Sequence, residues 1–132
     1  MGRPKKPALE FTGQARLLPG PKLVEMERDV LDQVRTAVVA AGCICMRNNV
    51  GAQKVGKRFI RYGLGKGSAD LICIVPPYGR FLGLEIKRPK GSVVTPEQAT
   101  WAEAVRRYGG VTGVVKNVSE AMLLVAEARR LP

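Results

Sequence analysis

The sequence predicts an α/β fold in which helices flank a β-sheet, with the element order α-β-β-β-α-β-α. Three observations lead to this prediction: apolar residues at helical spacing near the beginning, a continuously apolar stretch of strand length in the middle, and a helix-capping pattern after it. The 132 residues, of which 45% are hydrophobic, are enough for one domain with a buried core.

The first element is a helix predicted over 22–41. Gly42 ends it, because glycine commonly follows the last turn of a helix. Glu27 falls on the apolar face of this helix, which is unusual for a carboxylate. The apolar residues at helical spacing are Leu23, Val30, Val34, Ala37 and Ala41.

Strands are predicted next. A short strand over 43–47 is followed by a basic segment, 54–62, that is compatible with an exposed strand. The continuously apolar stretch 71–75 predicts a strand buried on both faces, and 80–88 predicts the strand that returns beside it.

A capped helix and one further strand and helix complete the domain. Thr95 is the predicted N-cap, with Pro96 at the first helical position and Gln98 in the capping-box position. A pair of glycines at 109–110 ends this helix, so that the last two elements are a strand over 111–116 and a helix over 119–130.

Composition narrows the function. Lys and Arg number 22 against 11 Asp and Glu, a net charge of +11, so nucleic acid is the expected partner. The absence of His excludes Ser/His/Asp triads and His-ligated metals, and three Cys make neither a closed disulfide set nor a four-thiolate zinc site. No apolar run reaches the roughly 20 residues of a membrane helix, so no membrane partner is expected.

Residues 1–21 hold four Pro and three Gly and are expected to form a basic flexible arm before the domain, 22–132.

Acidic residues are rare in the middle of the chain. Between residues 33 and 96 the only acids are Asp70 and Glu85, among eleven Lys and Arg. Glu85 and Lys87 share one face of the returning strand, because side chains alternate along a strand. A hairpin through 76–80 brings Asp70 and Glu85 onto neighbouring strands, where the two acids and Lys87 can meet.

Two converging carboxylates suit a divalent metal ion. Burying them together without a counter-charge costs several kcal/mol, which a cation removes. Carboxylate, carbonyl and water oxygens suit Mg²⁺ or Mn²⁺, which polarise a phosphoryl oxygen and lower the pKa of bound water. Lys87 can orient that water or neutralise charge in the transition state. The alternative is a chance Glu-x-Lys surface pair.

These residues carry a family resemblance. Ser68-Ala69-Asp70, fourteen further residues and Glu85-Ile86-Lys87 resemble the signature of the PD-(D/E)xK nucleases. The segment 65–90, with Thr95 to Gln98 and Trp101 after it, looks like the VRR-NUC branch of that superfamily, and Arg47-Asn48-Asn49 and the glycines at 109–110 are also similar to it. The resemblance covers about residues 23–128, with Ala69 where the family usually has Pro.

The resemblance implies a restriction-endonuclease-like core of order α-β-β-β-α-β around a central mixed sheet. It implies that Asp70, Glu85 and the backbone carbonyl of Ile86 bind the metal, and that Lys87 is the catalytic lysine. It also implies that Gln98 reaches the site from the following helix.

Two of the implied roles have alternatives. Gln98 can serve the capping box alone, or the cap and the site together. Glu27 matches the acid of the first helix, but Glu25 and Asp29 compete for that role. Glu27 is preferred because it lies on the predicted buried face; if it is structural, it is expected to pair with an Arg.

Basic residues before and beside the proposed site are candidate phosphate contacts. A solvated basic face is the alternative for any one of them. The candidates for nucleic-acid binding are Arg47, Asn48, Lys54, Lys57, Arg58, Arg61, Lys66 and Arg88.

The expected function is therefore that of a Mg²⁺- or Mn²⁺-dependent endonuclease that hydrolyses DNA, with no small-molecule cofactor. Family likeness alone adds branched DNA such as Holliday junctions as substrate and a two-fold homodimer. The basic N-terminus has no apolar segment behind it of the kind found in a secretory signal, so a cytoplasmic location, in a bacterial or phage-infected cell, is expected. The alternatives are a non-catalytic DNA-binding module on the same fold and an RNA-binding or structural protein.

Overall fold

The computed structural model describes residues 26–130. The predicted arm, 1–21, lies outside the described residues, as do 22–25 of the predicted first helix. The elements are α2 (Glu27–Ala40), β1 (Ile44–Arg47), β2 (Gly51–Val55), β3 (Arg58–Tyr62), β4 (Leu71–Val75), β5 (Arg80–Ile86), α3 (Pro96–Arg107), β6 (Val111–Val115) and α4 (Val118–Arg129).

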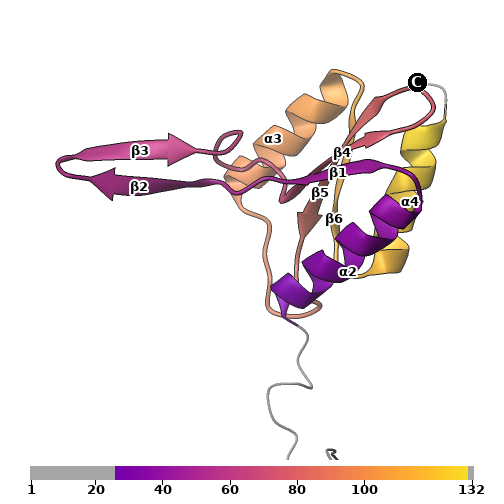
Figure 1. The fold of residues 1–132 in the computed structure, drawn as a ribbon, viewed down its shortest axis with the longest axis horizontal. Coiled ribbons are helices and arrows are strands. Elements are labelled where there is room, and N and C mark those ends of the chain that lie inside the picture. The colour runs from indigo at the N-terminus through magenta and orange to yellow at the C-terminus, as the bar shows by residue number, and fades with distance from the viewer. Residues whose placement is uncertain (1–25, 131–132) are drawn as a thin grey trace, which may run out of the picture.

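Four of the strands form one mixed sheet in the order β1-β4-β5-β6. β4 pairs antiparallel with β1 and β5, whereas β5 and β6 run parallel. The parallel pair requires a crossover, which α3 supplies. The predicted α/β class, with a mixed sheet flanked by helices, is confirmed (Figure 1).

Helices cover both faces of the sheet. A Cβ atom added at Gly83 in β5 would lie 2.8 Å from the Trp101 ring of α3, and one added at Gly113 in β6 would lie 2.8 Å from Leu124 of α4. Residues 83 and 113 lie on opposite faces, because Gly113 is the register partner of Leu84 and side chains alternate along a strand. α3 therefore covers one face and α4 the other, with α2 packed beside α4.

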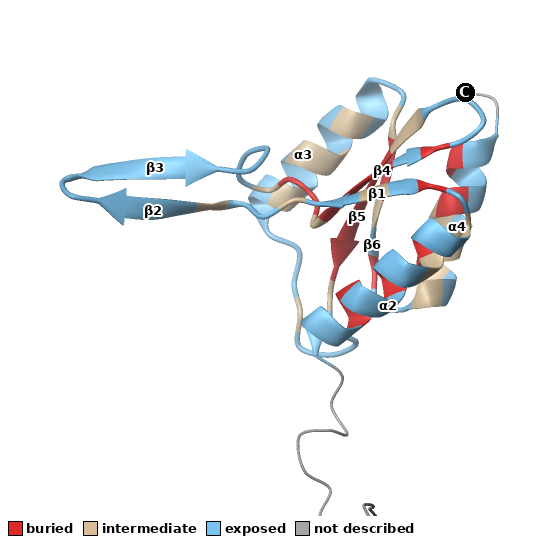
Figure 2. Ribbon diagram, in the orientation of Figure 1, coloured by how far each residue is buried: buried red, intermediate tan, exposed pale blue. Residues whose placement is uncertain are grey.

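The hydrophobic core lies between the sheet and the pair α2 and α4 (Figure 2). Alternate residues of β4 and β5 enter it from the sheet, and one face of α2 enters it from the helix layer. The fully buried large side chains are Val30, Val34, Val38, Leu71, Cys73, Val75, Leu82, Leu84, Ile86 and Val115. Cys43 and Cys73 are buried and Cys45 is half-buried, all as free thiols.

The opposite face, under α3, is more open. No residue of α3 is fully buried, and Tyr108 at its C-terminal end is 89% exposed. Ile74 of β4 is 39% exposed, so the prediction that this strand is buried on both faces is wrong at that residue. The reason is that α3 packs over β5 and β6 and leaves the β1 side of this face uncovered.

The segment 54–62 is not one strand but parts of two. β2 and β3 form a separate two-stranded antiparallel sheet, in which Val55 pairs with Arg58 across a two-residue turn. Gly56 opens this turn with φ of +64°, a conformation that glycine adopts without strain. The resulting hairpin projects away from the body of the molecule (Figure 1).

Candidate functional site

Asp70 and Glu85 lie side by side at the end of the central strands. Asp70 directly precedes β4, one residue beyond the last ladder pair, Leu71 with Leu84, so that it lies next to Glu85 of β5. The backbone N–H of Ile86 donates a hydrogen bond to Asp70 Oδ2 at 2.7 Å. The Asp70 carboxylate thus accepts the hydrogen bond that a backbone carbonyl would accept if the β4–β5 ladder continued. This bond fixes the position of the carboxylate.

The two carboxyl groups interact, and their pKa values are raised. Burial and, second, the charge of Asp70 raise the pKa of Glu85 to about 7. Burial also raises the pKa of Asp70, although the hydrogen bond from Ile86 works in the opposite direction. Like charges held together in a partly dry site favour binding of a cation or a proton.

Lys87 and Gln98 both contact Glu85. Lys87 follows Glu85 on the same face of the strand, and its Nζ lies 3.5 Å from Glu85 Oε2. Only 12% of the Lys87 side chain is exposed. Gln98 reaches the same oxygen from α3, with its Nε2 donating at 2.7 Å. The structure therefore brings Asp70, Glu85, Lys87 and Gln98 together.

Gln98 completes the capping box and also contacts a carboxylate of the candidate site. Its backbone N–H donates to Thr95 Oγ1 at 3.2 Å, and its side-chain Oε1 accepts from the Thr95 N–H at 3.0 Å, which completes the capping box. The same side chain donates to Glu85 through its other terminal atom. One residue thus fixes the start of α3 and the orientation of a site carboxylate.

Glu27 is placed differently from its prediction. It is the first residue of α2 and is exposed, so the expectation that it lies on the buried face is wrong. The helical stripe includes Val30 and Val34, but the first turn extends beyond the edge of the core. Glu27 still acts on the site at longer range, because its charge raises the pKa of Asp70.

Over residues 26–130, no group of three or more His, Cys, Asp or Glu side chains is close enough to hold a metal.

Asn48 has a positioning role that the sequence did not suggest. Its Nδ2 donates to Ser68 Oγ at 2.7 Å and to the Ala69 carbonyl at 2.8 Å, and its Oδ1 accepts from the Leu64 N–H at 3.1 Å. Its own N–H donates to the Asp70 carbonyl at 2.8 Å. Asn48 therefore holds the segment that carries Asp70, and its contact with nucleic acid stays a prediction.

The remaining basic candidates lie in three places. Arg47 and Lys66 line an open cleft of about 440 Å³ that also contains Asp70, Glu85 and Gln98. Lys66 lies 3.6 Å from Glu97 in an exposed ion pair. Arg88 is exposed after β5. The other four, Lys54, Lys57, Arg58 and Arg61, are on the β2–β3 hairpin.

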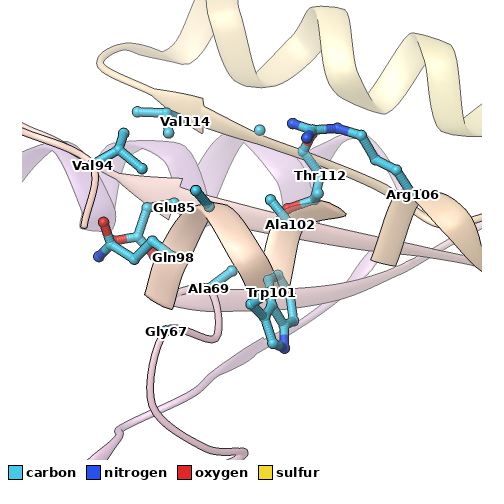
Figure 3. Close-up of a pocket in the computed structure, with 12 residues that line it drawn as sticks. Gly67, Ala69, Glu85, Val94, Gln98, Trp101, Ala102, Arg106, Thr112 and Val114 are labelled. Carbon is cyan, nitrogen blue, oxygen red and sulfur yellow. The ribbon is translucent and has the colours of Figure 1, made fainter. Parts of the chain in front are cut away.

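A second space adjoins the site beneath α3 (Figure 3). It has a volume of about 250 Å³ and is mostly apolar, with Glu85 and Gln98 at one end and Arg106 and Thr112 at the other. Glu85 and Gln98 line both spaces, so their hydrogen-bonded pair lies where the apolar space and the open cleft meet.

No family model matches the sequence, and no curated protein matches it. In the described part of the chain, no helix has the length and apolar character needed to cross a membrane.

Proposed function

We propose that this protein is a divalent-metal-dependent endonuclease that hydrolyses phosphodiester bonds in DNA, of the VRR-NUC branch of the PD-(D/E)xK superfamily. The observation that carries the proposal is the convergence of Asp70, Glu85 and Lys87 on one face at the end of the central strands. An acid pair beside a partly buried amine supports phosphodiester chemistry without His.

The donor set fits a hard divalent cation. Asp70 and Glu85 supply two carboxylates whose mutual repulsion a cation would relieve. Ile86 directs its N–H towards Asp70, and in an extended strand the carbonyl of a residue lies on the same side as its N–H. The proposed ligands, Asp70, Glu85 and the Ile86 carbonyl, are all oxygens, which suits Mg²⁺ or Mn²⁺.

In the proposed mechanism, each residue has a separate task. When bound, the metal supplies Lewis acidity towards a phosphoryl oxygen and lowers the pKa of bound water. Lys87 places a fixed positive charge where negative charge develops on the phosphoryl group. Gln98 orients Glu85, and the Ile86 N–H orients Asp70, so that neither carboxylate has to reorganise during the reaction.

The proposed substrate follows partly from charge and partly from resemblance. A net charge of +11, with Arg47 and Lys66 in the cleft, supports a polyanionic substrate. The preference for branched DNA such as Holliday junctions, and the two-fold homodimer, rest on the resemblance to stand-alone VRR-NUC proteins. We add both to the proposal on that ground.

One observation favours the alternative of a non-catalytic DNA-binding module on the same fold. Lys87 and Gln98 both engage Glu85 Oε2, so one oxygen of the acid pair already has two partners within the chain. A module of this kind would bind DNA in a salt-dependent manner without metal-dependent cutting.

The test is a cleavage assay on duplex, flap, splayed and four-way DNA with Mg²⁺, Mn²⁺ or EDTA. We expect metal-dependent cutting that Asp70→Asn lowers by at least about a hundredfold, since it removes a ligand, while DNA binding is kept. Asp32→Asn makes the same chemical change on the exposed face of α2 and is the matched control. No cutting of any substrate in either metal would favour the binding module.

A further inference from the structure

We infer that the β2–β3 hairpin is a groove-binding arm that inserts into the major groove of B-form duplex DNA beside the cut site. This inference rests on the proposed DNA substrate and adds how, and in which form, the duplex is held. Four independent features of the hairpin support it: its isolation from the body, its charge, its dimensions and its attachment.

The hairpin is isolated from the rest of the described protein. Every residue of β3 and all but the first of β2 are exposed, and neither strand packs extensively on another element (Figure 2). Phe59 is 70% exposed and Val55 52% exposed. A two-stranded ribbon alone is marginally stable in water, and Val55, Ile60 and Tyr62, each about half exposed, share one of its faces. This apolar face indicates a surface that a partner covers.

The charge of the hairpin selects a polyanion as that partner. Residues 51–62 contain no acid and four cations, Lys54, Lys57, Arg58 and Arg61. A second copy of the same hairpin would bring like charges together, which opposes self-association through this segment. Phosphate groups of DNA carry the complementary charge.

The hairpin is long enough to reach the floor of the major groove. Each strand has five residues, so the ribbon is about 17 Å long at about 3.4 Å per residue. The major groove of B-DNA is about 12 Å wide and about 8.5 Å deep and admits a two-stranded β-ribbon.

The cations are on both faces of the ribbon. Lys54 opposite Phe59 and Arg61 opposite Ala52 share one face, whereas Arg58 is on the other, opposite Val55. A ribbon that enters the groove with its tip first therefore presents cations to the phosphates of both strands. Phe59 and Val55 are then near the bases, where thymine methyl groups offer apolar contacts.

The base of the hairpin is attached to the candidate site. Asn48, three residues before β2, bonds to Ser68 and Ala69 and, through its N–H, to Asp70, and it accepts from Leu64 on the other side of the hairpin. Both ends of the ribbon are thus tied to the segment that carries an acid of the site. An arm held in this way places the cut site at a fixed offset from the groove that it occupies.

The experiment measures binding to a 20-base-pair duplex in EDTA, where no cutting is expected, together with protection of guanine N7 from dimethyl sulfate. N7 faces the major groove. The test variant combines Lys54→Gln with Arg58→Gln, one on each face of the ribbon. The matched control combines Arg107→Gln with Arg130→Gln, both exposed and outside the hairpin and the site.

We expect wild type and the control to protect N7 and the hairpin variant to lose protection and bind roughly tenfold more weakly. The plot of the logarithm of the binding constant against the logarithm of the salt concentration is expected to be less steep for the variant. The slope should be smaller by about 1.8, which is about 0.9 for each of two lost phosphate contacts. Double-stranded RNA, whose major groove is deep and narrow, is expected to bind more weakly than DNA. Thermal unfolding checks that both variants fold.

Retained N7 protection in the hairpin variant would overturn the inference. So would conversion of a dimer to a monomer by the hairpin changes with N7 protection unaltered, since the hairpin would then bind a second copy. If no metal-dependent cutting occurs but the hairpin changes still abolish protection, the nuclease proposal fails and the groove-binding arm stands. If wild type cuts DNA and the hairpin variant protects N7 as wild type does, the arm alone fails.

Discussion

The β4–β5 pair of the four-stranded sheet and the β2–β3 hairpin are built from the same kind of antiparallel ladder but have opposite surroundings. In the sheet, β4 and β5 are mostly buried between helices and place Asp70 and Glu85 side by side. In the hairpin, the strands are exposed and basic. The comparison suggests a division of tasks: packing fixes the geometry of the acids, whereas the absence of packing lets the hairpin reach a partner. Changes in the two regions should therefore alter different measured quantities.

The largest expected effect is on the rate of cleavage and comes from the sheet. Lys87→Met is expected to lower the rate at saturating enzyme by about a thousandfold, because it removes the charge placed on the transition state, while the DNA Kd changes by less than about twofold. The control is Lys90→Met, an exposed lysine in the loop after β5. Hairpin changes should instead raise the Kd. A Lys87 variant that mainly weakens binding would break the proposed division.

The second effect is on stability. Leu84→Ala in β5 is expected to lower the free energy of unfolding by about 2–5 kcal/mol, because Leu84 is fully buried and a cavity remains. Phe59→Ala in β3 removes a larger side chain but is expected to change it by no more than about 0.5 kcal/mol, since Phe59 is 70% exposed. Denaturant unfolding followed by circular dichroism measures both. A large loss for Phe59→Ala would show that the hairpin packs on the body.

The third effect depends on pH and is confined to the site in the sheet. The pKa of Glu85 is about 7 in the folded protein, whereas that of an ordinary glutamate is 4.5. Between these two pH values, Glu85 keeps its proton in the folded state but loses it in the unfolded state. Stability without metal should therefore fall as pH rises through this window, by at most about 1.4 kcal/mol per pH unit.

Glu85→Gln should flatten this dependence, and Glu103→Gln, an exposed acid of α3, should not. Thermal unfolding between pH 4 and pH 8 in EDTA is the measurement. Saturating Mg²⁺ should stabilise wild type more at pH 8 than at pH 5, because it binds the ionised pair. Stability that rises with pH through the window would contradict the assigned shift.

The smallest effects separate the two roles of Gln98. Thr95→Ala removes the side-chain cap and is expected to cost about 1 kcal/mol of stability with little change in the cleavage rate. Gln98→Ala also removes the hydrogen bond to Glu85 and is expected to lower the rate by about tenfold, on the order of 1.4 kcal/mol. Parallel unfolding and single-turnover assays measure the two quantities. Equal losses of cleavage rate in the two variants would mean that Gln98 affects the rate only through the helix cap.

Sequence patterns predicted the regions where burial fixes the structure. The apolar run of β4 and the alternation in β5 placed Asp70, Glu85 and Lys87 correctly on neighbouring strands, since a slip of one residue would expose the core face. The capping box at Thr95 is local chemistry and was also predictable. The assignment of function to these residues is still a proposal.

Patterns failed where no core constrains the chain. The hairpin has no buried face to impose alternation, and its Gly56-Lys57 turn is not among the strongest hairpin signals, so 54–62 looked like one strand. Helical periodicity put Glu27 on an apolar face but could not show where the core ends. The role of Asn48 depends on partners some twenty residues away, which local spacing does not reveal.

Gly83 determines how closely α3 approaches the sheet beside the candidate site. The Trp101 ring lies where a side chain at position 83 would be, so α3 packs this closely on β5 only because residue 83 has no Cβ. A methyl group added at position 83 would clash with the Trp101 ring and push α3 away from the sheet. Gln98 would then move out of reach of Glu85, and the hydrogen bond between them, where the open cleft and the apolar space meet, would be lost.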